Sequence, residues 1–112
     1  MVNWHSLETV FLDMDGTLLD LHFDNHFWLE HLPRRYAEYN NLSPEEARDT
    51  IIPMIMAERG SLNWYCTDYW SDRLDMDITG LKAEVGERIG YRPHVTDFLD
   101  AVRDTGLRSV IV

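Results

Sequence analysis

The sequence predicts an α/β fold in which two parallel strands are joined by a long, mostly helical crossover. The first strand is indicated by the run from Val10 to Leu12, whose residues suit burial on both faces of a parallel sheet. The second strand is predicted at residues 108–112, which follow a helical segment and end in the apolar run Val110–Val112. Because successive parallel strands need a crossover connection, the expected hand of this unit is right.

The residues after the first strand follow helical periodicity for most of the chain. Residues 22–41 predict a first helix, and Pro33 either kinks it or begins its second half. A second helix is expected after Ser43, because a proline follows at the first turn and Glu46 is placed to close a capping box. This helix runs towards Gly60.

Three more helices are expected before the second strand. Residues 63–74 predict a third, aromatic-rich helix, and Asp77 caps a fourth that continues to Val85. Pro93 opens the last helix, and Gly106 ends it. The apolar residues that this last helix places on one face are Val95, Phe98, Leu99 and Val102.

The composition indicates a globular chain, with 45% hydrophobic and 27% charged residues. No signal segment opens the chain and no apolar run is long enough to cross a bilayer, which predicts a cytoplasmic protein without membrane contact. The single cysteine, Cys66, suits a reducing compartment and is expected to be a small buried side chain. The formal net charge of −10 argues against nucleic-acid binding, because no basic stretch is available to neutralise phosphates.

The predicted sheet is small. Two strands are fewer than the three or so that an open sheet needs for independent stability, unless another element packs on it. The outer edges of both strands then remain exposed, and exposed edges pair readily with other chains. We therefore expect self-association, or a chain whose stability depends on its helices.

Two acidic residues follow the first strand at a glycine turn. Asp13 lies where the strand stops, at the carboxyl end where parallel sheets bind ligands. Gly16 allows a sharp turn that brings backbone N–H groups near a bound anion. Asp15, two residues after Asp13, adds a second hard oxygen ligand of the kind that Mg²⁺ prefers. The segment therefore predicts a magnesium-dependent phosphoryl-transfer site.

The two carboxylates suit two different roles. Asp13 is placed to attack phosphorus and form an aspartyl-phosphate, and Asp15 to protonate the leaving oxygen and then accept a proton from water. A calcium loop is the competing interpretation. An EF-hand spacing puts Phe11 at the first loop position and His22 at the twelfth, and neither is a carboxylate.

Several segments carry a family resemblance. The segment Thr9–Leu19 resembles the first motif of the haloacid-dehalogenase-like (HAD) hydrolase superfamily, a hydrophobic strand followed by Asp-x-Asp-Gly-Thr. Later segments resemble the bacterial GMP/IMP nucleotidase branch, a group of 5′-nucleotidases. They are Leu19-Asp20-Leu21, Phe23-Asp24-Asn25, Phe27-Trp28, Leu62-Asn63-Trp64-Tyr65-Cys66 and Asp68-Tyr69-Trp70-Ser71.

The resemblance implies a fold and a domain organisation. Residues 1–19 and 92–112 are expected to form the N-terminal part of a HAD-like Rossmannoid parallel sheet, with two core strands only. Residues 20–91 are expected to form an inserted helical cap.

The resemblance also implies roles for the motif residues and a Mg²⁺ cofactor. Asp13 is expected to be the nucleophile and Asp15 the general acid/base. The Asp13 carboxylate and the Asp15 main-chain carbonyl are the expected metal ligands. Met14, Gly16 and Thr17 are expected to bind the phosphate.

Only the first catalytic motif of the family is present. Family members end the second strand in a phosphate-binding Thr or Ser and add a later Lys and a later acidic pair, and none of these occurs up to Val112. We therefore expect the chain to be truncated after the second core strand, as an incomplete and inactive fragment of a phosphatase.

The substrate implied by the resemblance is a purine 5′-mononucleotide such as GMP or IMP. In the cap, Trp64 offers a ring for stacking, and Asn25 or Asn63 offers hydrogen bonds to a purine edge. Core packing is the competing interpretation for aromatic residues at helical spacing. His22 and His26 are four residues apart and form a metal pair only if a third ligand exists.

Two alternatives for the function stay open. A sugar-phosphate or phosphoglycolate phosphatase of the same fold shares the motif and differs only in its cap residues. A non-enzymatic remnant that self-associates is the alternative from another functional class.

Overall fold

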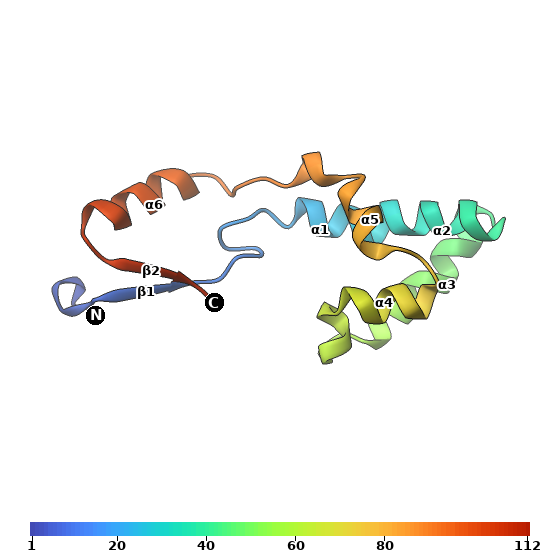
Figure 1. Ribbon diagram of the computed structural model, residues 1–112, viewed down its shortest axis with the longest axis horizontal. Helices are drawn as coiled ribbons and strands as arrows, with labels where there is room; N and C mark the ends of the chain where they lie inside the picture. The colour runs from blue at the N-terminus through green and yellow to red at the C-terminus, as the bar shows by residue number, and fades with distance from the viewer. The chain divides into compact units, whose positions relative to one another are not determined.

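The computed structural model describes all residues from 1 to 112, and they divide into two compact units (Figure 1). Unit 1 comprises residues 1–21 and 89–112, and unit 2 comprises residues 22–88. Unit 2 is thus a single continuous segment between the two parts of unit 1, and it is shorter at both ends than the predicted insertion of residues 20–91.

Unit 1 is built on a two-stranded parallel sheet, which confirms the predicted α/β class. The strands pair in a register that places Thr9 opposite Arg108 and Leu12 opposite Ile111. Helix α6 precedes the second strand in the sequence and packs against the sheet (Figure 1). The elements of this unit are a 3₁₀ turn (Trp4–Ser6), β1 (Thr9–Leu12), α6 (Val95–Asp104) and β2 (Arg108–Ile111).

Only one face of this sheet is buried. Leu12 and Leu18 form a small core with Val95 of α6. On the other face, Phe11 is 68% exposed. The prediction that the strands are buried on both faces is therefore wrong, because neighbouring strand residues point to opposite faces and α6 covers one of them.

Helix α6 begins later than predicted. Its first residue is Val95, and His94 at the N-cap has a left-handed backbone (φ 66°) without a side-chain cap. The residue before a proline is pushed towards an extended conformation. Arg92, which precedes Pro93, donates its N–H to the carbonyl of Leu18 at 3.0 Å, so the chain is still paired as an extended segment there.

The buried face of α6 is narrower than predicted. Val95 and Val102 are buried and Leu99 is half-buried, whereas Phe98 is 47% exposed. The three covered residues follow the i, i+4, i+7 spacing of one helix stripe, and Phe98 lies at its margin.

Unit 2 is entirely helical. The predicted helix over 22–41 is divided by one π-helical turn, in which the Leu32 N–H donates to the Phe27 carbonyl five residues back. Pro33 lies in the first turn of α2, so it begins the second half of this segment. None of the helices is long and apolar enough to span a membrane. The elements are α1 (His22–His26), the π turn (Phe27–His31), α2 (Leu32–Asn40), α3 (Pro44–Ala57), a 3₁₀ turn (Leu62–Tyr65), α4 (Thr67–Leu74), α5 (Ile78–Ala83) and a second 3₁₀ turn (Gly86–Arg88).

The predicted capping box at the start of α3 is confirmed. The Glu46 N–H donates to Ser43 Oγ at 3.1 Å, and the Ser43 N–H donates to Glu46 Oε2 at 2.8 Å. The bond from the Ser43 backbone, followed by the bond with its side chain, lowers the pKa of Glu46.

The aromatic segment after α3 is two elements rather than one helix. A 3₁₀ turn ends at Tyr65, and Cys66 then caps α4, its Sγ accepting the Tyr69 N–H at 3.4 Å. Cys66 is exposed, so the expectation of a buried side chain is wrong. The physical reason is that an N-cap residue lies outside the helix and turns its side chain to the first-turn N–H groups.

The next helix begins as predicted and ends early. Asp77 caps α5 by accepting the Gly80 N–H at 3.0 Å. The helix ends at Ala83, and Val85 follows in a turn, where it still packs into the core.

The core of unit 2 is aromatic and apolar. Trp70 is 1% exposed and makes edge contacts with Trp28 (ring centroids 5.7 Å apart) and Tyr69 (5.1 Å). The other buried members are Phe27, Leu32, Ile51, Ile55, Leu74, Ile78, Leu81 and Val85. Unit 2 therefore has a hydrophobic core of its own.

Candidate active site

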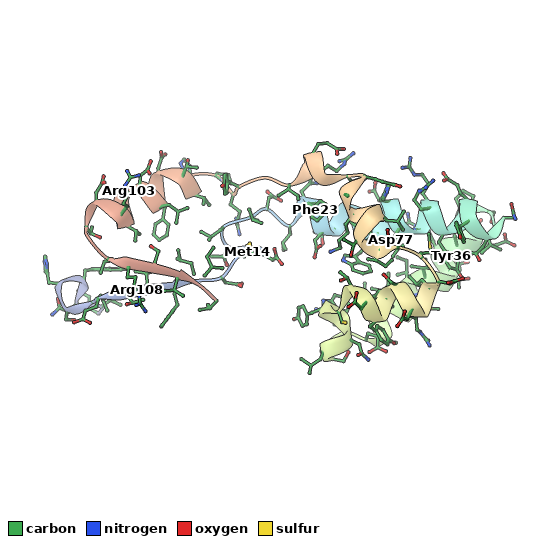
Figure 2. All side chains as sticks on the ribbon, viewed as in Figure 1. Met14, Phe23, Tyr36, Asp77, Arg103 and Arg108 are labelled. Atoms are coloured by element: carbon green, nitrogen blue, oxygen red, sulfur yellow. The ribbon has the colours of Figure 1, made fainter.

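The turn after β1 presents two exposed carboxylates. Asp13 directly follows the last residue of β1, and Asp15 lies in the turn beside Met14, which Figure 2 labels. Both aspartates are exposed, and neither belongs to any of the salt bridges of the structure. Their negative charge is therefore not neutralised within the protein.

Backbone hydrogen bonds close this turn tightly. The Leu19 N–H donates to the Met14 carbonyl at 2.8 Å, and the Gly16 N–H donates to the Leu19 carbonyl at 2.9 Å. These two bonds form a bridge around Asp15. Gly16 has φ +78°, a conformation that residues with a Cβ rarely adopt, so the turn requires a glycine at this position.

The residues predicted to bind phosphate lie in this turn, but two of their N–H groups are already used. The Gly16 N–H is bonded to Leu19, and the Thr17 N–H donates to the Met14 carbonyl at 3.3 Å. A phosphate contact at Gly16 or Thr17 would therefore need these bonds to open, or would use the Thr17 hydroxyl. The phosphate-binding roles of Met14, Gly16 and Thr17 stay predictions.

Arg92 contacts the turn, and sequence reasoning missed it. Its Nη1 donates to the Gly16 carbonyl at 2.7 Å. The two chain segments that join the units also pair with each other. The Asp20 N–H donates to the Gly90 carbonyl at 2.8 Å, and Leu19 and Tyr91 form an antiparallel bridge. No sequence signal connects Arg92 with Gly16, because the contact spans 76 residues.

The donor set of the turn fits a hard divalent cation. The two carboxylates are oxygen ligands, and Mg²⁺ takes one or two protein carboxylates with waters and substrate oxygens. Nowhere does the structure bring together three or more His, Cys, Asp or Glu in a way that could hold a metal, so a closed site of the zinc type is not formed. Asp13 and Asp15 are thus suited to share Mg²⁺ with a phosphate ester.

Known proteins that are similar to this chain include two curated relatives and a solved structure. No protein-family model matches the chain. Two curated proteins, both called GMP/IMP nucleotidase YrfG, from Escherichia coli K12 and Shigella flexneri, are 39% identical to it over 111 residues. These matches cover 99% of the chain and 50% of each relative, so the chain spans about half the length of the curated relatives it matches.

A solved structure shares the fold of this chain. A HAD phosphatase from Thermococcus onnurineus superposes with a TM-score of 0.77 over 95% of this chain and 50% of its own, at 24% sequence identity. The chain therefore has the fold of a HAD phosphatase. The strand and turn that carry Asp13 and Asp15 are the segment in which the sequence predicts the HAD motif, and this motif stays a prediction.

The three residues of unit 2 that are predicted to bind substrate differ in their surroundings. Asn25 is exposed. Asn63 donates its Nδ2 to Glu58 Oε2 at 3.3 Å. Trp64 packs against the core, and its carbonyl accepts the Trp70 indole N–H at 3.4 Å. Asn63 and Trp64 thus have structural contacts, and substrate binding by all three stays a prediction.

Glu58 is the centre of a polar cluster that sequence reasoning missed. Its carboxylate accepts hydrogen bonds from Tyr69 Oη at 2.7 Å, Ser61 Oγ at 2.8 Å and Asn63 Nδ2 at 3.3 Å. The bond from Tyr69, followed by that from Ser61, lowers the pKa of Glu58. The same contact raises the pKa of Tyr69. The cluster joins the end of α3 to α4.

This cluster predicts an acid-sensitive unit 2. A carboxyl whose folded pKa is lowered adds stability above its ordinary pKa of about 4.3, and this stability is lost as pH falls through the folded value. Urea unfolding of Glu58→Gln should therefore show a smaller loss of stability between pH 7 and about pH 3 than the wild type. Glu87→Gln is the matched control, because Glu87 is exposed and has no ion pair. Equal acid sensitivity in the wild type and Glu58→Gln would contradict the expectation.

The two histidines considered as a metal pair have other partners. Arg88 Nη1 donates to His22 Nε2 at 3.1 Å, because a guanidinium has no acceptor. His26 Nδ1 lies 3.3 Å from Glu30 Oε2. The pair gains no third ligand.

A buried histidine ties α5 to the first helical segment. His31 is 4% exposed, and its Nδ1 accepts from Arg34 Nη2 at 3.1 Å. The proton therefore resides on Nε2, which donates to Glu84 Oε2 at 2.8 Å. Glu84 also pairs with Arg35 at 3.4 Å.

Proposed function

We propose that this chain is part of a HAD hydrolase and carries the nucleophile and the general acid/base of a Mg²⁺-dependent phosphomonoesterase that acts on purine 5′-mononucleotides such as GMP and IMP. The observation that carries the proposal is the pair of exposed carboxylates without ion pairs, Asp13 and Asp15, in a closed turn at the carboxyl end of β1. The 39% identity to proteins called GMP/IMP nucleotidase supports the choice of substrate.

The proposed reaction has two steps. Asp13 attacks phosphorus in line, and the bond from phosphorus to the ester oxygen breaks while Asp15 gives that oxygen a proton. Water then attacks the aspartyl-phosphate, Asp15 takes a proton from it, and inorganic phosphate leaves with Asp13 restored. The exposure of both side chains leaves room for substrate and water.

Mg²⁺ would be held by the Asp13 carboxylate and the Asp15 main-chain carbonyl. When bound, it would offset the negative charge of the phosphate and of the two aspartates. This matters in a chain of net charge −10, since a phosphate ester is otherwise repelled.

The substrate class depends on unit 2, because the motif itself handles only phosphate. Among the predicted cap residues, Asn25 is the one whose side chain is exposed without a hydrogen bond or ion pair. Sugar phosphates and phosphoglycolate remain the alternative substrates for the same turn. We place the protein in the cytoplasm, and self-association through the outer strand edges stays a prediction.

The test is inorganic phosphate release with Mg²⁺ from GMP, IMP, a sugar phosphate and phosphoglycolate. Asp13→Asn should lower release by at least about a thousandfold, because no other side chain replaces the nucleophile. Asp97→Asn is the matched control, since Asp97 is an exposed aspartate in the first turn of α6. No release by either the wild-type chain or Asp13→Asn would contradict the enzymatic proposal for this chain. It would agree with the inactive fragment that the sequence predicts and with the non-enzymatic alternative.

A further inference from the structure

The conformation of Gly16 depends on bonds to both of its peptide groups. Its N–H belongs to the peptide that also contains the Asp15 carbonyl, and it donates to Leu19 at 2.9 Å. Its own carbonyl belongs to the next peptide and accepts from Arg92 Nη1 at 2.7 Å. Because peptide groups are planar, holding both planes fixes the two backbone dihedrals of the residue between them.

Hydrogen bonds to both flanking peptide groups restrict the backbone of a glycine more than that of any other residue. Glycine populates positive and negative φ with similar ease, so Gly16 has no side chain that keeps it at φ +78°. The Asp15 carbonyl, a proposed Mg²⁺ ligand, lies in the peptide whose N–H is tied to Leu19. Freedom at Gly16 would therefore reach the acid/base residue and this carbonyl directly.

The side chain that binds the Gly16 carbonyl belongs to Arg92, in the segment that follows unit 2. Arg92 is fixed through its own backbone, because its N–H donates to the Leu18 carbonyl at 3.0 Å. Pro93 follows it and restricts its backbone to extended conformations. A charged donor at 2.7 Å makes a stronger bond to a carbonyl than a neutral one.

We propose that Arg92 is a positioning residue that holds the turn carrying Asp13 and Asp15 in its working conformation through the Gly16 carbonyl. The proposal rests on the proposed phosphatase function for its catalytic consequence. The structural part, that Arg92 fixes Gly16, stands independently of that function.

The test compares amide hydrogen exchange in Arg92→Ala, Arg92→Lys and the wild-type chain. In Arg92→Ala the Gly16 and Leu19 amides should exchange about threefold to tenfold faster, a modest effect because the arginine is exposed. Arg92→Lys keeps a charged donor and should recover part of the protection. Arg108→Ala is the matched control, since Arg108 is an exposed arginine of β2 whose side chain has no hydrogen bond or ion pair.

The amide of Val112, which donates to the Leu12 carbonyl at 2.9 Å, reports on the sheet. It should exchange at the wild-type rate in Arg92→Ala. Unchanged exchange at Gly16 and Leu19, or faster exchange at Val112 as well, would overturn the assignment. The first result would mean that Arg92 does not fix the conformation of Gly16. The second would mean that Arg92 stabilises unit 1 as a whole.

The catalytic consequence has its own readout. In the phosphate-release assay, kcat of Arg92→Ala should fall by about tenfold with KM for GMP unchanged, and Arg92→Lys should restore part of kcat. Local loss of protection with unchanged kcat would overturn the positioning role. A wild-type chain that releases no phosphate would contradict the proposed function, while hydrogen exchange would still decide whether Arg92 fixes Gly16.

Discussion

Asp15→Asn should slow phosphate release from GMP by about a hundredfold to ten-thousandfold, because the asparagine amide cannot give the leaving oxygen a proton or accept one from water. The two side chains have nearly the same size and shape, and Asp15 is exposed and without an ion pair. The backbone bonds around Asp15 use peptide groups only, so the turn should stay closed in the variant.

The choice of substrate separates the two roles of Asp15. An aryl phosphate with an acidic phenol as leaving group needs little protonation, so the first step should survive in Asp15→Asn and the phenol should appear in a burst. Release of inorganic phosphate should remain slow, because water still lacks its base. Wild-type rates of phosphate release in Asp15→Asn would contradict the assignment of the general acid/base.

Trp70→Ala should destabilise unit 2 by about 3–5 kcal/mol, the usual cost of removing a large buried aromatic side chain. Trp70 is 1% exposed and contacts two aromatic rings, and its indole N–H donates to the Trp64 carbonyl at 3.4 Å. The substitution would leave a cavity and an unpaired carbonyl.

The measurement is urea unfolding followed by far-ultraviolet circular dichroism, which does not depend on the removed indole. Leu62→Ala is the control, since Leu62 lies in the same unit and is 89% exposed. A loss below about 1 kcal/mol in Trp70→Ala would mean that unit 2 does not depend on this core.

Features governed by neighbouring residues were predictable from the sequence. The Ser43 capping box, the Asp77 cap and the strand that ends just before Asp13 all follow from residues a few positions apart. Local sequence sets these features because the groups that satisfy one another belong to the same turn.

Features governed by distant contacts were not predictable in this way. The exposure of Phe11 depends on which face α6 covers, and the cluster around Glu58 joins two helices. The bond between Arg92 and Gly16 joins residues that precede and follow unit 2 in the sequence. The hydrophobic periodicity of a sequence indicates on which face of its helix or strand a residue lies. It does not indicate which other element covers that face.

The central claim is that Asp13 is the nucleophile. The most direct test is to mix the chain with Mg²⁺ and the aryl phosphate, quench in acid, reduce with borohydride and map the modified residue by peptide mass spectrometry. Reduction converts an aspartyl-phosphate to homoserine, so the account predicts homoserine at position 13 in the wild type, more of it in Asp15→Asn, and none in Asp13→Asn. Phosphate release without modification at Asp13, or release that persists in Asp13→Asn, would contradict it.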